Sequence, residues 1–230
     1  MKPSLEFLRS VALFSALPEA ALDEIAARSQ ACAVEEGGFF FMQGDEVRAM
    51  YVLTQGRVKL TQVSPDGQQV GLRMLTPPQM FAGIAILSPQ KGYPVSAEAL
   101  ADSTALAWEG HELHTLASRY PALSMGIMDV MRAYIEEMQS RVRELSTERV
   151  ERRVARALLR LTMQTGSKRD DGSIEIALSR QDLAEMSGTT VFSASRILSE
   201  WERRGLIETG RERVVIRQPH GLVSIAEDLE

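Results

Sequence analysis

The chain has 230 residues and a mass of 25.5 kDa, and 44% of its residues are hydrophobic and 25% charged, which is typical of a globular protein and excludes a disordered or fibrous chain. Its one cysteine, Cys32, cannot by itself form an internal disulfide, a zinc site or an iron–sulfur cluster. No stretch approaches the roughly 18 apolar residues of a membrane-spanning helix, so we expect a soluble, cytoplasmic protein without a membrane partner.

The net charge of −5 conceals an uneven distribution of charge along the chain. Residues 141–217 hold 16 Lys and Arg against 12 Asp and Glu, whereas the rest of the chain holds 10 against 19. A basic C-terminal segment behind an acidic remainder is typical of a nucleic-acid reader joined to another domain. An arginine-rich, solvated helix face is the alternative interpretation.

The first half of the chain predicts helices followed by strands. Residues 4–33 have apolar residues at helical spacing and predict two short helices. From 34 to 108, short apolar runs alternate with turn residues, which indicates a small antiparallel barrel or sandwich. The runs Val52–Leu53 and Val58–Leu60 flank Gly56 and predict a hairpin.

A long helix is predicted between residues 121 and 146, where apolar residues recur at steps of three and four. This spacing indicates a coiled-coil-like stripe that meets a partner helix, and we interpret it as a homodimer seam. Burial against the chain's own strands is the alternative. The stripe consists of Leu123, Ile127, Met131, Tyr134, Met138, Val142 and Leu145.

The remaining residues have the pattern of a winged helix-turn-helix. An arginine-rich helix ends near Gly166 and is followed by two shorter helices around Gly188. Ala184 leaves room for a close helix crossing, Gly188 suits the turn, and Ala194 and Ile197 turn inward on the second helix. The run ETGRERVVI then supplies two strands for a wing.

In the order of these parts as well as in motif, the chain resembles the cAMP receptor protein and fumarate–nitrate regulator (Crp/Fnr) superfamily. The resemblance is carried by the runs GDEVRAMYVLTQGRVKL, AEALADSTAL, ERVERRVARALLRL and LSRQDLAEMSGTTVFSASRILSEWERRGLI. It implies an α+β chain with a cyclic-nucleotide-binding-like antiparallel β-barrel over residues 1–120, a dimerisation helix over 121–147 and a winged helix-turn-helix over 148–230.

The resemblance also implies a function. We expect a homodimeric, sequence-specific transcription regulator that binds double-stranded operator DNA and RNA polymerase. Activation and repression both stay open. The sequence has no glycine-rich phosphate loop, no paired metal-ligand spacing and no set of residues resembling a catalytic triad. We therefore expect neither an enzyme nor a metal site.

The residues that contact DNA bases in family members correspond to positions on the second helix of the motif. Val191, Phe192 and Arg196 stand where cAMP-type members carry Arg, Glu and a second Arg. Ser195 and Arg196 keep the end of the Glu-x-x-Ser-Arg pattern of fumarate–nitrate-type members, whose Glu is replaced by Phe192. Arg196 can pair with guanine O6 and N7, and Phe192 can touch a thymine methyl. The phosphate contacts are expected from Ser179, Arg180, Gln181, Thr190 and Ser193.

The effector of this chain is expected to differ from cAMP. In cAMP-binding relatives a Glu holds the ribose and an Arg holds the cyclic phosphate, and these positions are Ile84 and Val95 here. A buried phosphate without a cationic partner is strongly disfavoured. An apolar pocket for a small molecule is one interpretation of this region, and a plain core is the other. The pocket residues would be Leu72, Met74, Phe81, Gly83, Ile84, Val95, Ser96, Tyr134 and Met138.

Haem is a further possible effector ligand. The absence of the cAMP contacts and of a cysteine cluster is similar to the nitric-oxide-responsive, haem-associated branch of the superfamily. His111 and His114 lie three residues apart on a predicted helix and, with Met80, are candidate axial ligands. Two polar positions on a helix surface are the alternative for the histidines. A constitutive regulator, whose barrel serves only as a dimerisation scaffold, is the alternative function.

Overall fold

The computed structural model describes residues 3–83 and 92–229, and the predicted pocket residue Ile84 therefore lies outside the described residues. The chain divides into two compact units. The N-terminal unit comprises residues 1–63 and 74–139, and the C-terminal unit comprises residues 64–73 and 140–230. None of the helices within the described ranges is long and apolar enough to cross a membrane.

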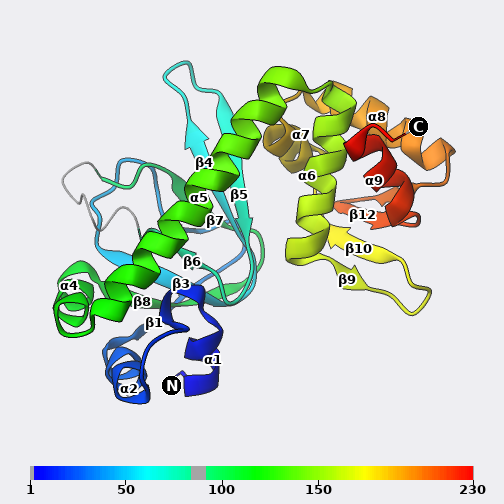
Figure 1. The fold of residues 1–230 in the computed structure, drawn as a ribbon. Coiled ribbons are helices and arrows are strands. Elements are labelled where there is room, and N and C mark those ends of the chain that lie inside the picture. Colours follow the sequence, from blue (N-terminus) through cyan, green and yellow to red (C-terminus); the bar gives the residue numbers. More distant parts are fainter. Residues whose placement is uncertain (1–2, 84–91, 230) are drawn as a thin grey trace. The chain divides into compact units, whose positions relative to one another are not determined.

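Two antiparallel sheets of four strands each form the centre of the N-terminal unit, although residues 69–73 of one edge strand are counted with the C-terminal unit (Figure 1). Their strand orders are β1-β8-β3-β6 and β2-β7-β4-β5, which confirms the predicted antiparallel β domain. The strands are β1 (Gln30–Val34), β2 (Phe39–Phe41), β3 (Ala49–Gln55), β4 (Val58–Val63), β5 (Gln69–Leu75), β6 (Met80–Phe81), β7 (Ser96–Ala99) and β8 (Ser103–Glu109).

The hairpin predicted around Gly56 is wrong, because the chain changes sheets at this glycine. Strand β3 pairs with β8 and β6, whereas β4 pairs with β7. Gly56 has a φ of +88°, and a Cβ there would lie 2.2 Å from Ser103 Oγ. Only glycine fits this close approach in the left-handed region, so Gly56 forms a corner between the sheets.

Aromatic rings fill the space between the two sheets. Phe41 stacks on Tyr93 with ring centroids 3.8 Å apart, and Tyr51 stacks on Phe81 at 5.1 Å. The Tyr93 hydroxyl donates to Ala49 O and accepts from the amides of Arg48 and Ala49. Its polar end is therefore satisfied within a buried cluster.

Helices cover one sheet of the N-terminal unit. Trp108 of β8 is fully buried, donates from Nε1 to Ile25 O at 2.8 Å and meets Phe14 edge to face. This burial ties the first helices to the sheet, and the predicted pair of short helices is confirmed. The helices are α1 (Leu5–Ser10), a 3₁₀ turn (Ala12–Phe14), α2 (Glu19–Arg28), α4 (Gly110–Arg119) and the long helix α5 (Pro121–Thr147).

The C-terminal unit contains three helices around a small sheet and a fourth helix at the chain's end. Its sheet has the order β11-β12-β10-β9, and strands β11 and β12 form the predicted wing. The core includes the fully buried Leu158, Leu198 and Trp201. The elements are α6 (Val150–Thr165), β9 (Ser167–Lys168), β10 (Ile174–Ala177), α7 (Arg180–Ser187), α8 (Val191–Arg203), β11 (Ile207–Gly210), β12 (Arg213–Ile216) and α9 (Pro219–Glu227).

Candidate DNA-binding interface

Helix α7 and the turn after it set the position of the recognition helix. Ser179 caps α7 by accepting from Asp182 N at 3.0 Å, and its own hydroxyl donates to Asp182 Oδ2 at 2.6 Å. Gly188 ends the helix in the left-handed conformation, with φ +62°. A Cβ at Gly188 would lie 2.5 Å from Leu145 Cδ2. The left-handed backbone therefore favours glycine at this turn, as the sequence predicts, whereas the end of the Leu145 side chain could shift.

Helix α8 presents two different faces. Thr190 caps the helix by accepting from Ser193 N at 3.1 Å. One face is buried, and Trp201 on it donates from Nε1 to Glu151 Oε1 at 3.0 Å. The opposite face carries Phe192, which is 80% exposed, and Arg196, which lies one turn further along the helix. The buried residues are Ala194, Ile197, Leu198 and Trp201.

A groove of about 750 Å³ runs beside the outer face of α8. Phe192, Ser195 and Arg196 line it together, so the structure brings three of the predicted base-reading residues to one surface. An apolar ring beside a guanidinium offers contact with a thymine methyl next to bidentate pairing with guanine. Its other lining residues are Glu151, Ile197, Ser199, Glu200 and Arg203.

The predicted phosphate-contacting residues lie at the starts of α7 and α8. Thr190 and Ser193 share the capping hydrogen bonds of α8, and Ser179 is engaged in capping α7. Arg180 is exposed, and its Nη2 donates to Thr209 Oγ1 of the wing at 3.4 Å. Gln181 is exposed and donates to Glu185 Oε1 at 2.7 Å. Helix N-termini with free amides are suited to phosphate.

Arg153 of α6 binds backbone carbonyls at the turn of the helix-turn-helix. Its guanidinium donates to Ser187 O at 3.1 Å, to Gly188 O at 3.0 Å and to Glu148 O at 3.1 Å. A cation at the C-terminus of α7 satisfies carbonyls that have no partner within the helix and complements its dipole. Sequence reasoning missed this role, because a lone arginine in an arginine-rich helix gives no signal of which carbonyl it meets.

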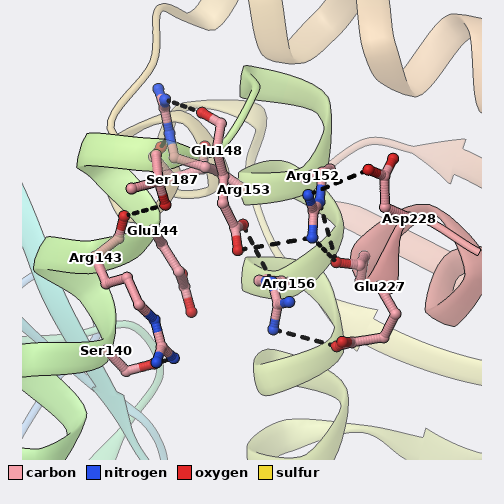
Figure 2. A network of polar contacts seen from close by, with 12 residues as sticks. Ser140, Arg143, Glu144, Glu148, Arg152, Arg153, Arg156, Ser187, Glu227 and Asp228 are labelled. Atoms are coloured by element: carbon pink, nitrogen blue, oxygen red, sulfur yellow. Dashed lines mark hydrogen bonds and ion pairs between the residues drawn. The ribbon is translucent and has the colours of Figure 1, made fainter.

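Two other arginines of α6 bind the C-terminal helix α9 (Figure 2). Arg152 donates to Ala226 O at 3.3 Å and lies 3.5 Å from Asp228 Oδ2. Arg156 lies 3.2 Å from Glu227 Oε1 and 3.1 Å from Glu148 Oε2. These cations are engaged within the unit, so the excess of basic residues counted over residues 141–217 overstates the positive charge available for DNA.

Two family models match the chain in the same order as its two units. One, the Crp-like helix-turn-helix domain, matches residues 152–225, and the other, the cyclic nucleotide-binding domain, matches residues 32–120. The chain belongs to the Crp/Fnr family. It is thus a helix-turn-helix DNA-binding transcription regulator of this family, whose members are generally dimers.

Relatives of this Crp/Fnr protein are regulators from several bacteria. Transcriptional regulator LdrP of Thermus thermophilus is 28% identical over 176 residues, which cover 76% of this chain and 86% of the relative. The transcriptional activator protein Anr of Pseudomonas protegens is 26% identical over 209 residues, covering 90% and 83%. The crystal structure of the Thermus thermophilus catabolite activator protein superposes with a TM-score of 0.55 at 26% identity, covering 95% and 100%.

The predicted effector residues of the Crp/Fnr protein do not gather around one cavity. Phe81 and Val95 pack into the aromatic core between the sheets, and Met74 is buried. The hydroxyl of Ser96 accepts from Gln43 N at 2.9 Å. Leu72 belongs to the C-terminal unit and Tyr134 and Met138 are half-buried on α5, so among the described members only Gly83 lines a large cavity of the N-terminal unit.

The haem-ligand candidates, in contrast, do come together. His111, His114 and Met80 all line one cavity of about 590 Å³ within the N-terminal unit. His111 and His114 project from α4, and both are exposed. Imidazole and thioether are established axial ligands of haem iron, and the donor set therefore fits this group.

The predicted dimer stripe on α5 divides between two surfaces. Ile127 packs against the core cluster of the N-terminal unit together with Val130. Met128, Ile135, Val142 and Leu145 are each more than half exposed. The exposed apolar stripe therefore has Met128 and Ile135 in place of the predicted Ile127 and Tyr134. With the half-buried Met131 and Met138, the seam is Met128, Met131, Ile135, Met138, Val142 and Leu145.

Proposed function

We propose that this regulator binds a two-fold operator in which Arg196 reads guanine and Phe192 reads a neighbouring thymine. The exposure of both side chains along one groove supports this assignment. Phe192 has no acceptor for cytosine N4, so the preference differs from the family patterns that use Glu at this position. A bidentate arginine–guanine pair contributes about 1–3 kcal/mol of discrimination.

Selection from random DNA tests the operator assignment. The unmodified chain should recover half-sites with guanine and a nearby thymine, and Phe192→Glu, which restores Glu-x-x-Ser-Arg, should replace the thymine preference with cytosine on the contacted strand. Thr190→Ser, which keeps the cap hydroxyl, is the control and should leave the recovered sequence unchanged. The proposal would be contradicted if the unmodified chain recovered the half-site of either the cAMP-type or the fumarate–nitrate-type members.

The proposed dimer joins two copies of α5 along the exposed seam defined above. Steps of three and four over six positions match the heptad spacing of a two-stranded coil. Two copies place the two recognition helices on one face of DNA, about one helical turn apart. This geometry requires a two-fold symmetric operator.

The proposed effector is a small molecule other than cAMP. Val95 lies half-buried against the aromatic core and offers no charge for a phosphate, and the Ser96 hydroxyl is engaged by a backbone amide. Calorimetry with cAMP should show no binding at micromolar concentration. A dissociation constant in the low micromolar range would contradict this part of the proposal.

Haem, with nitric oxide as the signal, is one effector that the residues can accommodate, because His111, His114 and Met80 line one cavity. Bound haem would supply an iron centre for diatomic gases. The test is a hemin titration of the anaerobic protein, followed by operator binding with and without nitric oxide. A Soret band that His111→Ala/His114→Ala changes, with gas-dependent DNA affinity, supports a gas sensor. Operator affinity independent of every ligand supports the alternative, a constitutive regulator with the barrel as scaffold.

A further inference from the structure

The cavity of about 590 Å³ in the N-terminal unit has a predominantly apolar wall. Its volume lies within the range of small-molecule sites. The aromatic cluster between the sheets is a separate feature, since none of its rings lines the cavity; the cluster consists of Phe40, Phe41, Tyr51, Phe81 and Tyr93. The apolar lining residues are Leu13, Val47, Met50, Met80, Leu113, Ala117, Ile127, Val130 and Met131.

Among the described residues that line the cavity, four have polar side chains: Arg48, Glu109, His111 and His114. Glu109 already has a partner, because its Oε2 lies 3.3 Å from His111 Nδ1. His111 Nε2 lies 3.6 Å from Glu112 Oε1. Arg48 is held only loosely, since its Nε lies 3.8 Å from Glu46 Oε2 and both side chains are largely exposed.

We infer that this cavity binds an apolar small molecule that carries a carboxylate, with the apolar body against the methionine-rich wall and the carboxylate on Arg48. Methionine side chains adapt to ligands of different shape, and an arginine–carboxylate pair is a strong, directional hydrogen-bonded contact. A fatty acid and a porphyrin share this chemistry.

The cavity is placed where a ligand can act on the dimerisation helix. Ile127, Val130 and Met131 of α5 line it, and Met131 also belongs to the proposed seam. Gly126 fixes the start of α5, because a Cβ there would lie 2.5 Å from Leu13 O. A ligand at this wall therefore touches the helix that carries the seam. Its role as an effector rests on the proposed function, whereas its binding does not.

Titration of the full-length chain with two probes tests the inference: hemin, and palmitate below its aggregation concentration. One or both should bind one molecule per chain. Ala117→Phe fills the cavity and should raise the dissociation constant at least about tenfold, and Arg48→Gln should raise it about five- to tenfold because the carboxylate loses its partner. Ala133→Phe, at an exposed α5 position outside the cavity and the seam, is the control and should change nothing.

Binding of hemin alone or of palmitate alone identifies the source of the carboxylate. The inference is overturned if neither probe binds, or if both Ala117→Phe and Arg48→Gln bind as tightly as the unmodified chain. Because Ala117 packs against the core, its variant is checked by thermal unfolding, and the exposed Arg48 keeps the test valid if that variant is unstable. Operator binding of the ligand-free chain, measured separately, tests the proposed function independently.

Discussion

Arg160 of α6 donates from Nη1 to both carboxylate oxygens of Glu144, each at 2.8 Å, and Glu144 is only 6% exposed. Glu144 lies in the last turns of α5, so this pair joins the end of the long helix to the first helix of the DNA-binding unit. A buried carboxylate requires such a partner, because its desolvation is costly.

Glu144→Gln should destabilise the C-terminal unit by about 2 kcal/mol, because Arg160 then loses a charged acceptor in a poorly solvated position. Urea unfolding measures this loss. The matched control is Glu136→Gln, which removes the exposed pair between Arg132 and Glu136 on the same helix and should cost less than about 0.5 kcal/mol. Equal losses in the two variants would show that the burial of Glu144 contributes nothing.

Arg180 and Arg196 should affect DNA binding in different ways. Arg180→Ala should weaken specific and non-specific DNA equally and reduce the slope of log affinity against log salt by about one, because a phosphate contact releases a counterion. Arg196→Ala should weaken operator binding about 10- to 100-fold and leave non-specific binding nearly unchanged.

Fluorescence anisotropy over a range of salt concentrations, with operator and scrambled duplexes, measures both effects. Arg132→Ala, on the exposed surface of α5, is the control and should leave the slope unchanged. If Arg180→Ala changed the affinity only for operator, Arg180 would read bases and its assignment to phosphate would be wrong.

The carboxylate of Asp171 makes the stability of the C-terminal unit sensitive to acid. Hydrogen bonds from the Ser173 hydroxyl and amide, followed by one from Arg217, hold the pKa of Asp171 well below its ordinary value of 3.8. Because the folded state favours the charged form, this stabilisation is present above pH 3.8 and is lost as the pH falls through the lower folded pKa.

Thermal unfolding against pH tests this linkage. Asp171→Asn should lower the melting temperature near neutral pH, and its difference from the unmodified chain should shrink below about pH 4. The neighbouring Asp170→Asn is the control, and it should not reproduce the effect. A constant difference at every pH would show that lost hydrogen-bond geometry, and not charge, accounts for the change.

The parts of the fold that depend on local sequence could be predicted, and those that depend on distant partners could not. Gly188 signals the turn because its backbone requirement is local. Gly56 gives the same local signal, yet it forms a corner between sheets, because β3 and β4 pair with the distant strands β8 and β7 and not with each other. Arg153 likewise meets carbonyls more than 30 residues away.

The exposed apolar stripe of α5 could be predicted in its period but not in its phase. Ile127 and Met128 are both apolar, and either fits a heptad pattern within the sequence. The core cluster against which Ile127 packs decides which of the two faces outward. Of the effector residues predicted from the family positions, Phe81 and Val95 lie in the core, whereas Gly83 lines the cavity.

The last prediction concerns this seam. Ile135→Lys places a charge in the middle of the exposed stripe, and it should convert the dimer to a monomer, because a buried lysine without a partner costs more than a marginal three-heptad coil contributes. Sedimentation velocity measures the mass. Met163→Lys, which changes a residue that is 90% exposed on α6, is the control and should leave the dimer intact.

Operator affinity should fall together with dimerisation in Ile135→Lys, since one recognition helix reads only half of a two-fold site. A fully dimeric Ile135→Lys would place the seam on another face of α5, and Ile127→Lys would then be uninformative, because that side chain packs in the core of its own chain.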